Sequence, residues 1–290
     1  MFEPIEDVAF TKLLGGMVMK TIFITGASSG IGRAAVKHFA ERGWNVVASM
    51  RSPEQETEFI TLDNVLVLRL DVEKEDTIQS ALAEAIQRFG KIDVLLNNAG
   101  YGTMGLIEAA TDEQIRRQFE VNVFGLIRMT KAMLPHFRAS QEGLLINISS
   151  MGGKVTFPTM SLYHSSKFAV EGFSESVSYE LASQNIKVKL IEPGAINTDF
   201  GGRSMEFFFD DALTDYQSFT AAFRGKLAQM EKDPAYASPP EMVAETIYQA
   251  ATDGTSQFRY VVGEDAKMLI QMKENTDEEE YLSNIAQHFS

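Results

Sequence analysis

The sequence predicts an α/β protein, built as a single domain around one doubly wound, mostly parallel sheet with helices on both faces. Short apolar, β-branched runs alternate with helical patterns through the first two hundred residues, which is the order expected of parallel strands joined by helical crossovers. No Pro-, Gly- or Ser-rich linker interrupts this order in the 290 residues. The seven expected strands lie near residues 21–25, 45–49, 65–71, 92–97, 143–149, 186–192 and 258–262.

The first strand runs directly into a glycine-rich turn. The run Lys20–Thr25 is followed by Gly26-Ala-Ser-Ser-Gly30-Ile-Gly32, and residues 33–40 then have helical spacing. A strand, a glycine loop and a helix N-terminus offer backbone N–H groups to a pyrophosphate. Glycine turns without a ligand exist, but the flanking strand and helix favour a dinucleotide site. The pattern predicts a Rossmann-type fold, although the Gly-x-x-x-Gly-x-Gly spacing differs from the usual Gly-x-Gly-x-x-Gly.

A tyrosine and a lysine stand four residues apart in a helical segment. Tyr163 and Lys167 share one helix face, and Ser150 lies thirteen residues upstream at the end of an apolar run. An ammonium beside a phenol favours the phenolate and lowers the phenol pKa, which makes a usable proton donor or acceptor. Such a pair on its own is usually a solvated surface pair. His164 points about 100° away from Tyr163 on the helix, so we expect it to be a surface or packing residue.

Several motifs occur together in one order. They are Thr25-Gly-Ala-Ser-Ser-Gly-Ile-Gly32, Asn97-Asn-Ala-Gly100, Asn122, Ser150, Tyr163 with Lys167, and Pro193-Gly194. Their order and spacing resemble the single-domain branch of the short-chain dehydrogenase/reductase family, over about residues 19 to 265. The Ala-Ser-Ser of the loop and Met-Arg-Ser after the second strand resemble its steroid and retinol dehydrogenases.

The resemblance implies catalytic roles for four side chains. Tyr163 would be the general acid/base, and Lys167 would lower its pKa and bond the nicotinamide ribose. Ser150 would hold the substrate oxygen. Asn122 would kink a helix and position a water molecule for proton relay.

The resemblance also implies a set of cofactor contacts. Asp71 would accept a hydrogen bond from the adenine amino group, and residues 193–198 would flank the nicotinamide carboxamide. Each position has an ordinary structural alternative, such as an aspartate that caps a helix or a proline that ends a strand. The expected cofactor-binding residues are Gly26, Ser28, Ser29, Gly30, Ile31, Gly32, Arg51, Asp71, Val72, Asn98, Ala99, Gly100, Tyr163, Lys167, Pro193, Gly194, Ile196 and Thr198.

The end of the second strand bears on the choice of cofactor. A site that prefers NAD(H) places a carboxylate there for the ribose 2′-OH, whereas this chain has Met50 followed by Arg51. The Arg51 guanidinium suits a 2′-phosphate, and Ser29 adds a hydroxyl donor. Arg51 as an ordinary surface arginine is the alternative. We expect NADP(H) to be favoured over NAD(H).

Composition excludes several classes of function. Lys plus Arg number 26 and Asp plus Glu 40, so the formal net charge of −14 disfavours nucleic acid and anionic membranes. There are no cysteines, and the four histidines have no metal-like spacing, so we expect no metal site. No apolar run reaches the ~20 residues of a membrane span, and the N-terminus lacks a secretory pattern, so we expect a cytoplasmic protein. Asn147-Ile-Ser149 matches a glycosylation triplet but falls in an expected buried strand.

Three segments lie outside the predicted sheet and its helices. Residues 1–18 are expected to be an extension without a catalytic role, or to precede a natural start at Met17 or Met19. Residues 266–290 are an acidic tail for which Leu282, Ile285, Ala286 and Phe289 predict one amphipathic helix, docked on this domain or on a neighbour.

Residues 198–234 resemble the substrate lid of the family. They are aromatic, with Phe200, Phe207, Phe208, Phe209, Tyr216, Phe219 and Phe223. These rings either bind an apolar substrate or pack the lid on the domain. Gly201-Gly202 offers hinge freedom, and Asp210-Asp211 is expected to cap the following turn.

The function expected from the resemblance is an NADP(H)-dependent oxidoreductase that interconverts a carbonyl and a secondary or primary alcohol. A non-catalytic NADP(H)-binding sensor, and a lyase or epimerase on the same scaffold, are the alternatives. The resemblance implies a homodimer or homotetramer that pairs through the helices carrying Asn122 and Tyr163. Apolar area for that pairing is expected from Phe168, Val170, Phe173 and Val177, which the domain core explains equally well.

Overall fold

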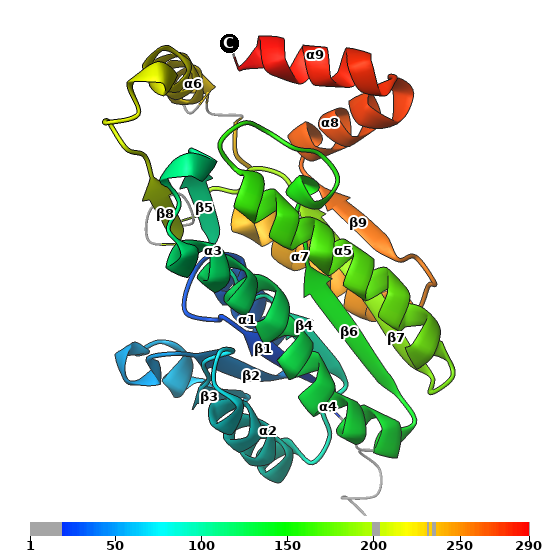
Figure 1. The fold of residues 1–290 in the computed structure, drawn as a ribbon. Helices are drawn as coiled ribbons and strands as arrows, with labels where there is room; N and C mark the ends of the chain where they lie inside the picture. The colour runs from blue at the N-terminus through cyan, green and yellow to red at the C-terminus, as the bar shows by residue number, and fades with distance from the viewer. Residues whose placement is uncertain (1–18, 199–203, 231, 234–235, 290) are drawn as a thin grey trace, which may run out of the picture.

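The computed structural model describes residues 19–198, 204–230, 232–233 and 236–289 (Figure 1). The extension 1–18 therefore lies outside the described residues, as do Phe200 and the Gly201-Gly202 pair of the expected lid.

A seven-stranded sheet forms the centre of the molecule. All its pairings are parallel, in the order β3-β2-β1-β4-β6-β7-β9, and the order reverses beside β1, as in doubly wound folds. The seven predicted strands are thus confirmed, within a few residues at each end. The strands are β1 (Thr21–Thr25), β2 (Asn45–Met50), β3 (Val65–Arg69), β4 (Val94–Asn97), β6 (Gly143–Ile148), β7 (Ile186–Pro193) and β9 (Arg259–Val262).

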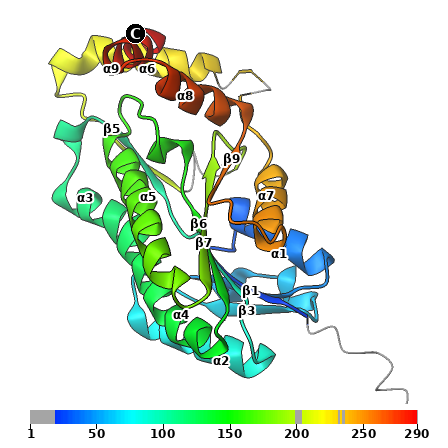
Figure 2. The same ribbon diagram turned by 90° about the vertical axis from the view of Figure 1, so that its right-hand side faces the viewer.

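Helices cover both faces of the sheet (Figure 2). One face carries α1 (Gly30–Glu41) and α7 (Pro240–Thr252). The other carries α2 (Glu75–Phe89), α4 (Leu126–Ser140) and α5 (Ser161–Ala182), and α3 (Asp112–Phe119) leads into α4.

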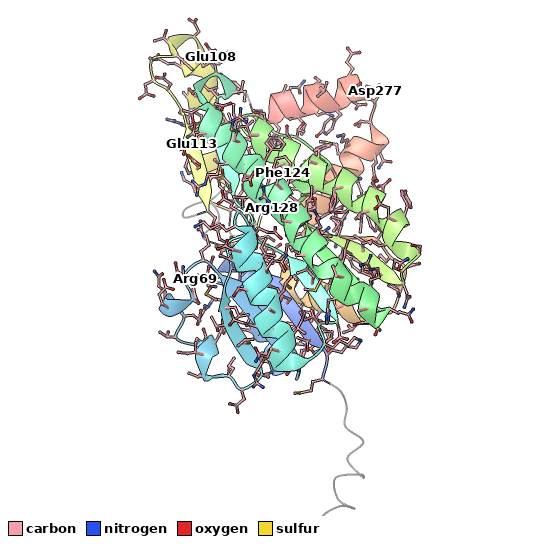
Figure 3. The ribbon with its side chains drawn as sticks, turned by 60° about the horizontal axis from the view of Figure 1, so that its bottom comes forward. Arg69, Glu108, Glu113, Phe124, Arg128 and Asp277 are labelled. Atoms are coloured by element: carbon pink, nitrogen blue, oxygen red, sulfur yellow. The ribbon has the colours of Figure 1, made fainter. Side chains whose placement is uncertain are left out.

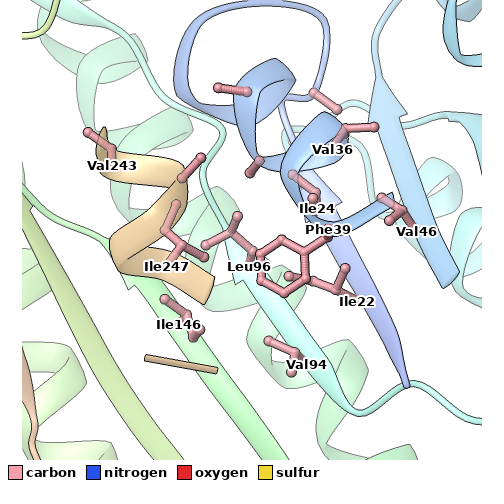
Figure 4. Packing of buried hydrophobic residues seen from close by; sticks show 14 of the residues in the cluster. Ile22, Ile24, Val36, Phe39, Val46, Val94, Leu96, Ile146, Val243 and Ile247 are labelled. Atoms are coloured by element: carbon pink, nitrogen blue, oxygen red, sulfur yellow. The ribbon is translucent and has the colours of Figure 1, made fainter. Parts of the chain in front are cut away.

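The central strands are apolar throughout because both faces are buried. On β1, Ile22 and Ile24 pack toward α1 and α7, whereas Phe23 packs into the cluster on the opposite face. Figure 4 shows Phe39 of α1 and Ile247 of α7 meeting the strand side chains in this core. The strands read as continuous hydrophobic runs for this reason, which made them easy to predict.

A second, two-stranded parallel sheet was not predicted. It pairs β5 (Gly102–Gly105) with β8 (Met205–Phe208), which lie about one hundred residues apart in sequence. A Cβ atom at Gly105 would overlap the backbone of Phe208, so glycine permits the close approach. The run Gly-Thr-Met-Gly has no strand-like composition by itself, and only the long-range pairing makes it a strand.

The acidic tail forms two helices rather than the one predicted. Helix α8 (Glu264–Asn275) follows β9 directly, and α9 (Glu278–His288) begins at Asp277. The Asp277 carboxylate accepts a hydrogen bond from the Glu280 N–H at 2.8 Å and caps α9, which is why the chain breaks there. Both helices pack on their own domain, through Ile270, Tyr281, Ile285 and Phe289.

Two of the residues considered for subunit pairing belong to the core. Val170 and Val177 of α5 are buried within their own domain, whereas Phe168 is 41% exposed. Phe124, in the segment before α4, is also exposed and is labelled on the outer surface in Figure 3. Within the described ranges, no helix combines the length and apolar character needed to cross a bilayer.

A buried ammonium joins β7, α7 and β9. Lys189 is 3% exposed, and its Nζ donates to Asp253 at 2.6 Å, to the Tyr260 hydroxyl at 2.8 Å and to the Ala250 carbonyl at 2.8 Å. The Tyr260 hydroxyl donates in turn to Asp253 at 2.6 Å. These hydrogen bonds, with Lys189 first among the side-chain partners, outweigh partial burial and hold the pKa of Asp253 far below its usual range.

We predict that Asp253→Ala lowers the free energy of unfolding by about 3 kcal/mol, because it leaves the Lys189 ammonium buried without its counter-ion. Urea unfolding measures this. Asp112→Ala is the control: it removes the exposed ion pair with Arg116 and should cost less than about 1 kcal/mol. Equal losses for the two variants would contradict the account.

Candidate active site

The sequence motifs meet at one edge of the sheet. Because all seven strands are parallel, the carboxyl ends of β1, β4, β6 and β7 lie side by side. The segments that follow them are the glycine loop, residues 98–100, Ser150 and the loop 194–198. Figure 2 shows α6 (Gln217–Met230), α8 and α9 gathered at this same end of the molecule.

The glycine loop fits a pyrophosphate. Gly26 has a φ of +70°, and a Cβ atom at Gly32 would overlap the Gly26 carbonyl, so the loop folds tightly against the start of α1. The N-cap of α1 is Ser29, whose side chain makes no capping hydrogen bond. By helix geometry the first N–H groups of α1 have no intrahelical acceptor, and they are available to an anion.

Asn98 fastens the end of β4 to this loop. Its Nδ2 donates to the carbonyls of Thr25 and Gly26 at 2.9 and 3.0 Å. The backbone N–H groups of Asn98 and Ala99 both donate to the Thr25 hydroxyl at 3.0 Å. The side chain of Asn98 therefore supports the loop, and the exposed Gly100 lies beyond it.

Tyr163, Ser150 and Lys167 form one buried group; each is less than a tenth exposed. The side chains of Tyr163 and Ser150 share a hydrogen bond. The Ser150 Oγ also accepts from the Gly152 N–H at 3.0 Å. Lys167 donates from Nζ to the carbonyl of Ile148 at 2.9 Å, and Nζ lies 5.8 Å from the Tyr163 ring centroid. The ammonium thus points inward, toward the end of β6.

Burial controls the ionisation of this group. It raises the pKa of the Tyr163 phenol, and the hydrogen bond with Ser150 offsets part of that rise. Burial also lowers the pKa of Lys167 to about 8, against a smaller opposing effect of Glu171. The expected lowering of the Tyr163 pKa by Lys167 is therefore not the dominant effect here, because desolvation outweighs it.

Asn122 lies in a distorted helix, as expected. Residues Glu120–Gly125 form a π-helical segment between α3 and α4, and Asn122 is buried within it. Its side chain accepts from the Tyr101 N–H at 3.0 Å and donates to the Tyr101 carbonyl at 2.8 Å. It also donates to the Ser166 hydroxyl at 3.1 Å, which donates to the Tyr163 carbonyl at 2.7 Å. Sequence reasoning missed Ser166, although its place between Tyr163 and Lys167 was a signal.

The remaining cofactor candidates surround the loop. Arg51 is exposed after β2 and makes no ion pair within the part of the chain that is described. Asp71 follows β3 and accepts from the Glu73 N–H at 3.2 Å, so it helps to form the turn before α2, which begins at Glu75. Thr198 reaches the glycine loop, 3.4 Å from where a Cβ atom of Gly30 would stand. The other candidates Ser28, Ile31, Val72, Pro193, Gly194 and Ile196 occupy the same strand edge.

A series of rings connects Tyr163 to the lid and the tail. The Tyr163 and His164 centroids lie 5.9 Å apart, and His164 lies 5.4 Å from Phe157. Phe157 lies 5.6 Å from Phe289 of the tail, which lies 5.6 Å from Phe223 of α6.

Methionines complete this apolar cluster, which contains Met104, Met151, Met160, Met205, Met230 and Met272. Of the other lid aromatics, Phe208 is buried, whereas Phe207, Tyr216 and Phe219 are exposed. The lid therefore partly packs on the domain. Asp210 caps the turn before α6, as expected, by accepting from the Ala212 N–H at 2.8 Å.

A groove of about 700 Å³ lies away from this edge, between α5, α8 and β9. It is lined by charged side chains such as Glu175, Arg259 and Lys273 and does not include Tyr163 or Ser150. The candidate catalytic residues therefore lie at the carboxyl ends of the strands, outside this groove.

A sequence model of the short chain dehydrogenase family matches residues 20–206. The chain belongs to the short-chain dehydrogenase/reductase family. This confirms the resemblance seen in the motifs. Family membership makes the protein an oxidoreductase that acts on CH–OH groups, and the substrate is a small molecule.

Known family members match most of the chain. An uncharacterized oxidoreductase from Schizosaccharomyces pombe is 39% identical over 234 residues, covering 81% of this chain and 97% of that protein. The 3-ketodihydrosphingosine reductase of Bacteroides thetaiotaomicron is 34% identical over 247 residues, covering 85% and 89%. A short-chain dehydrogenase from Streptomyces avermitilis superposes with a TM-score of 0.76 at 30% identity, covering 93% and 96%. Among other solved structures of this fold, some contain NADP and others NAD or NADH.

His164 is a packing residue that secures the loop after Ser150. Its Nε2 accepts from the Phe157 N–H at 3.0 Å, so Nδ1 carries the proton and donates to the Gly152 carbonyl at 2.9 Å. The ring is 3% exposed, and burial lowers its pKa to about 4.

We predict that this histidine makes stability depend on pH. Its folded pKa of about 4 lies below the ordinary 6.5, so the unfolded chain takes up the proton first as the pH falls. The neutral His164 contributes its full stabilisation above pH 6.5. As the pH falls from 7 to 5, the free energy of unfolding decreases by about 2 kcal/mol. His164→Gln should start less stable at pH 7 but lack this loss. Parallel pH curves for the two proteins in chemical unfolding would refute the prediction.

Proposed function

We propose that the protein is an NADP(H)-dependent oxidoreductase that interconverts a carbonyl and a primary or secondary alcohol, with Tyr163 as the general acid/base. One observation carries the proposal. The buried Tyr163–Ser150 pair stands at the same strand edge as the glycine loop, beside the inward-pointing Lys167.

Each residue of the group has a part in the proposed chemistry. A bound NADPH supplies the hydride to the carbonyl carbon. Tyr163 donates its proton to the carbonyl oxygen, and the Ser150 hydroxyl stabilises the developing negative charge on that oxygen. Lys167 holds the nicotinamide ribose. The raised pKa of Tyr163 keeps the phenol protonated near neutral pH, which suits proton donation and hence reduction.

Asn122 completes the proposed proton relay. Its side chain is fixed by Tyr101 and Ser166, and the π-helical segment brings it to the helix face near Tyr163. In this arrangement the protein returns a proton to Tyr163 through Lys167 and a water molecule held near Asn122.

The proposed cofactor site runs along the strand edge. The first turn of α1 and residues 26–32 hold the pyrophosphate, and Asp71 with Val72 and residues 98–100 contact the adenosine. The loop 193–198 flanks the nicotinamide carboxamide. Thr198, in this loop, lies beside Gly30 of the glycine loop. This closeness supports the assignment, because the pyrophosphate and the nicotinamide of one dinucleotide must bind at the same edge of the sheet.

The preference for NADP(H) rests on Arg51. No carboxylate stands at the end of β2, and Arg51 is exposed and without an ion pair to any described residue. Glu56 and Glu58 follow Arg51 closely in sequence. Both of these carboxylates form ion pairs with Arg33 of α1. A 2′-phosphate therefore meets a cation that is not already neutralised.

We infer an apolar substrate from the cluster above the site. Rings and methionines from the lid, the loop after Ser150 and the tail surround this end of the sheet. The name of the Bacteroides thetaiotaomicron relative, a reductase of 3-ketodihydrosphingosine, is in line with an apolar ketone.

We also infer a homodimer or homotetramer that pairs through the helices carrying Asn122 and Tyr163. The exposed rings of Phe124 and Phe168 on these helices support such a contact.

We predict that Tyr163→Phe lowers turnover at least about a hundredfold, because it removes the proton donor. NADPH binding should persist, since the ring and its packing stay. Reduction of a panel of apolar ketones and aldehydes, followed by NADPH absorbance, measures turnover. Tyr179→Phe is the control, because Tyr179 lies on the same helix and is 73% exposed. Near wild-type turnover in Tyr163→Phe would refute the mechanism.

We predict that Arg51→Ala lowers the ratio of kcat/KM for NADPH over NADH by about tenfold, the value of one charge-assisted hydrogen bond. Arg69→Ala is the control, since Arg69 ends β3 and pairs with Glu54 at 2.9 Å. A wild type that prefers NADH, or an unchanged ratio in Arg51→Ala, would defeat the assignment.

A further inference from the structure

A carboxylate of the tail helix α8 forms a hydrogen bond with the loop that follows β7. Asp265 is the second residue of α8, and its Oδ2 accepts a hydrogen bond from the backbone N–H of Ala195 at 2.7 Å. Gly263, the N-cap residue before α8, has no side chain with which to cap the helix. The Asp265 carboxylate reaches from the first turn of α8 to the loop that follows β7.

Two glycines make room for this carboxylate. A Cβ atom at Gly194 would overlap both carboxylate oxygens of Asp265, and one at Gly263 would overlap Oδ1. Gly263 has a φ of +102°, which side-chain-bearing residues rarely adopt. The carboxylate thus fills a backbone niche between the end of β7 and the start of α8.

The Asp265 contact continues the pairing of β7 with β9. The register ends at Pro193 opposite Val262, and the Gly194 N–H donates to the Val262 carbonyl at 2.8 Å. The next N–H, that of Ala195, has no strand partner left and is taken by Asp265.

On its other side, the loop is held by Ser238. The Ser238 N–H donates to the Ala195 carbonyl at 2.9 Å, and the Asn197 N–H donates to the Ser238 carbonyl at 2.8 Å. The loop 193–197 is therefore held from both sides. The contacts with Ser238 and Val262 are backbone hydrogen bonds, whereas the contact with Asp265 is made by a side chain.

We propose that Asp265 is a positioning residue that sets the conformation of the loop 193–198 and thereby the placement of the nicotinamide ring. The inference rests on the proposed function, in which this loop flanks the nicotinamide carboxamide. The Ser150 Oγ lies 3.5 Å from the Pro193 carbonyl oxygen. A shift of the loop would therefore also move the Ser150 hydroxyl, which we propose stabilises the substrate oxyanion. Through Asp265, the carboxyl-terminal tail takes part in cofactor geometry.

The test compares Asp265→Ala, Asp265→Asn and the control Glu264→Ala. Glu264 is the adjacent residue; it is exposed and pairs with Lys267. Three properties are measured: hydrogen–deuterium exchange of the 193–198 peptide without added cofactor, the Kd for NADPH, and the stereospecificity of transfer from NADPH deuterated on one face of C4. The thermal midpoint is recorded for every variant.

Asp265→Ala should speed hydrogen–deuterium exchange at the Ala195 N–H and lower the stereospecificity of hydride transfer. It should also weaken NADPH binding about tenfold, as expected for the loss of one hydrogen bond to a charged group. Asp265→Asn should restore most of each property, since its amide oxygen also accepts an N–H. Glu264→Ala should match the wild type. Gly194→Ala provides a second route, because it displaces the carboxylate while Asp265 is present; it should speed exchange at Ala195 as Asp265→Ala does.

Unchanged exchange and NADPH affinity in Asp265→Ala would overturn the inference, even if the thermal midpoint falls. The two failures are distinguishable. A wild type that does not bind NADPH overturns the proposed function, whereas a wild type that binds NADPH no better than a folded Asp265→Ala overturns only the role of Asp265.

Discussion

The parallel alignment of the strands is the constraint on which the site depends. Residues that are distant in sequence reach one edge only because β1, β4, β6 and β7 all run in the same direction. Buried side chains hold the strands together there: Asn97 donates to Asn147 at 2.9 Å, and Asn147 donates to Ser174 of α5 at 2.8 Å. These buried hydrogen bonds tie β4 and β6 to each other and to α5, the helix that carries Tyr163.

Burial then gives the site its chemistry. Desolvation raises the pKa of Tyr163 and lowers that of Lys167 to about 8, so the phenol becomes a weaker acid and the ammonium a stronger one. We expected the lysine to dominate by its charge. The structure shows that the amine is committed to the Ile148 carbonyl, and that the hydroxyl of Ser150 is the group that favours the phenolate.

The sequence was informative wherever a feature is local. The seven strands, the glycine loop and the helical spacing of Tyr163 and Lys167 are each encoded within a short segment, and all were predicted. Features that need a distant partner were missed: β5 becomes a strand only against β8, and Asp265 acquires its role only through Ala195. The start of the second tail helix has a local signal in Asp277 and Glu280, but the apolar spacing of the tail alone does not reveal it. The roles of the site residues, the assembly and the cytoplasmic location stay predictions.

A crystal structure with bound NADP⁺ tests the central claim most directly. The account predicts a pyrophosphate on the first turn of α1 and a nicotinamide ring between Tyr163 and the loop 193–198, with Lys167 on the adjoining ribose. A dinucleotide bound elsewhere, or a nicotinamide ring turned away from the Tyr163 hydroxyl, would contradict it.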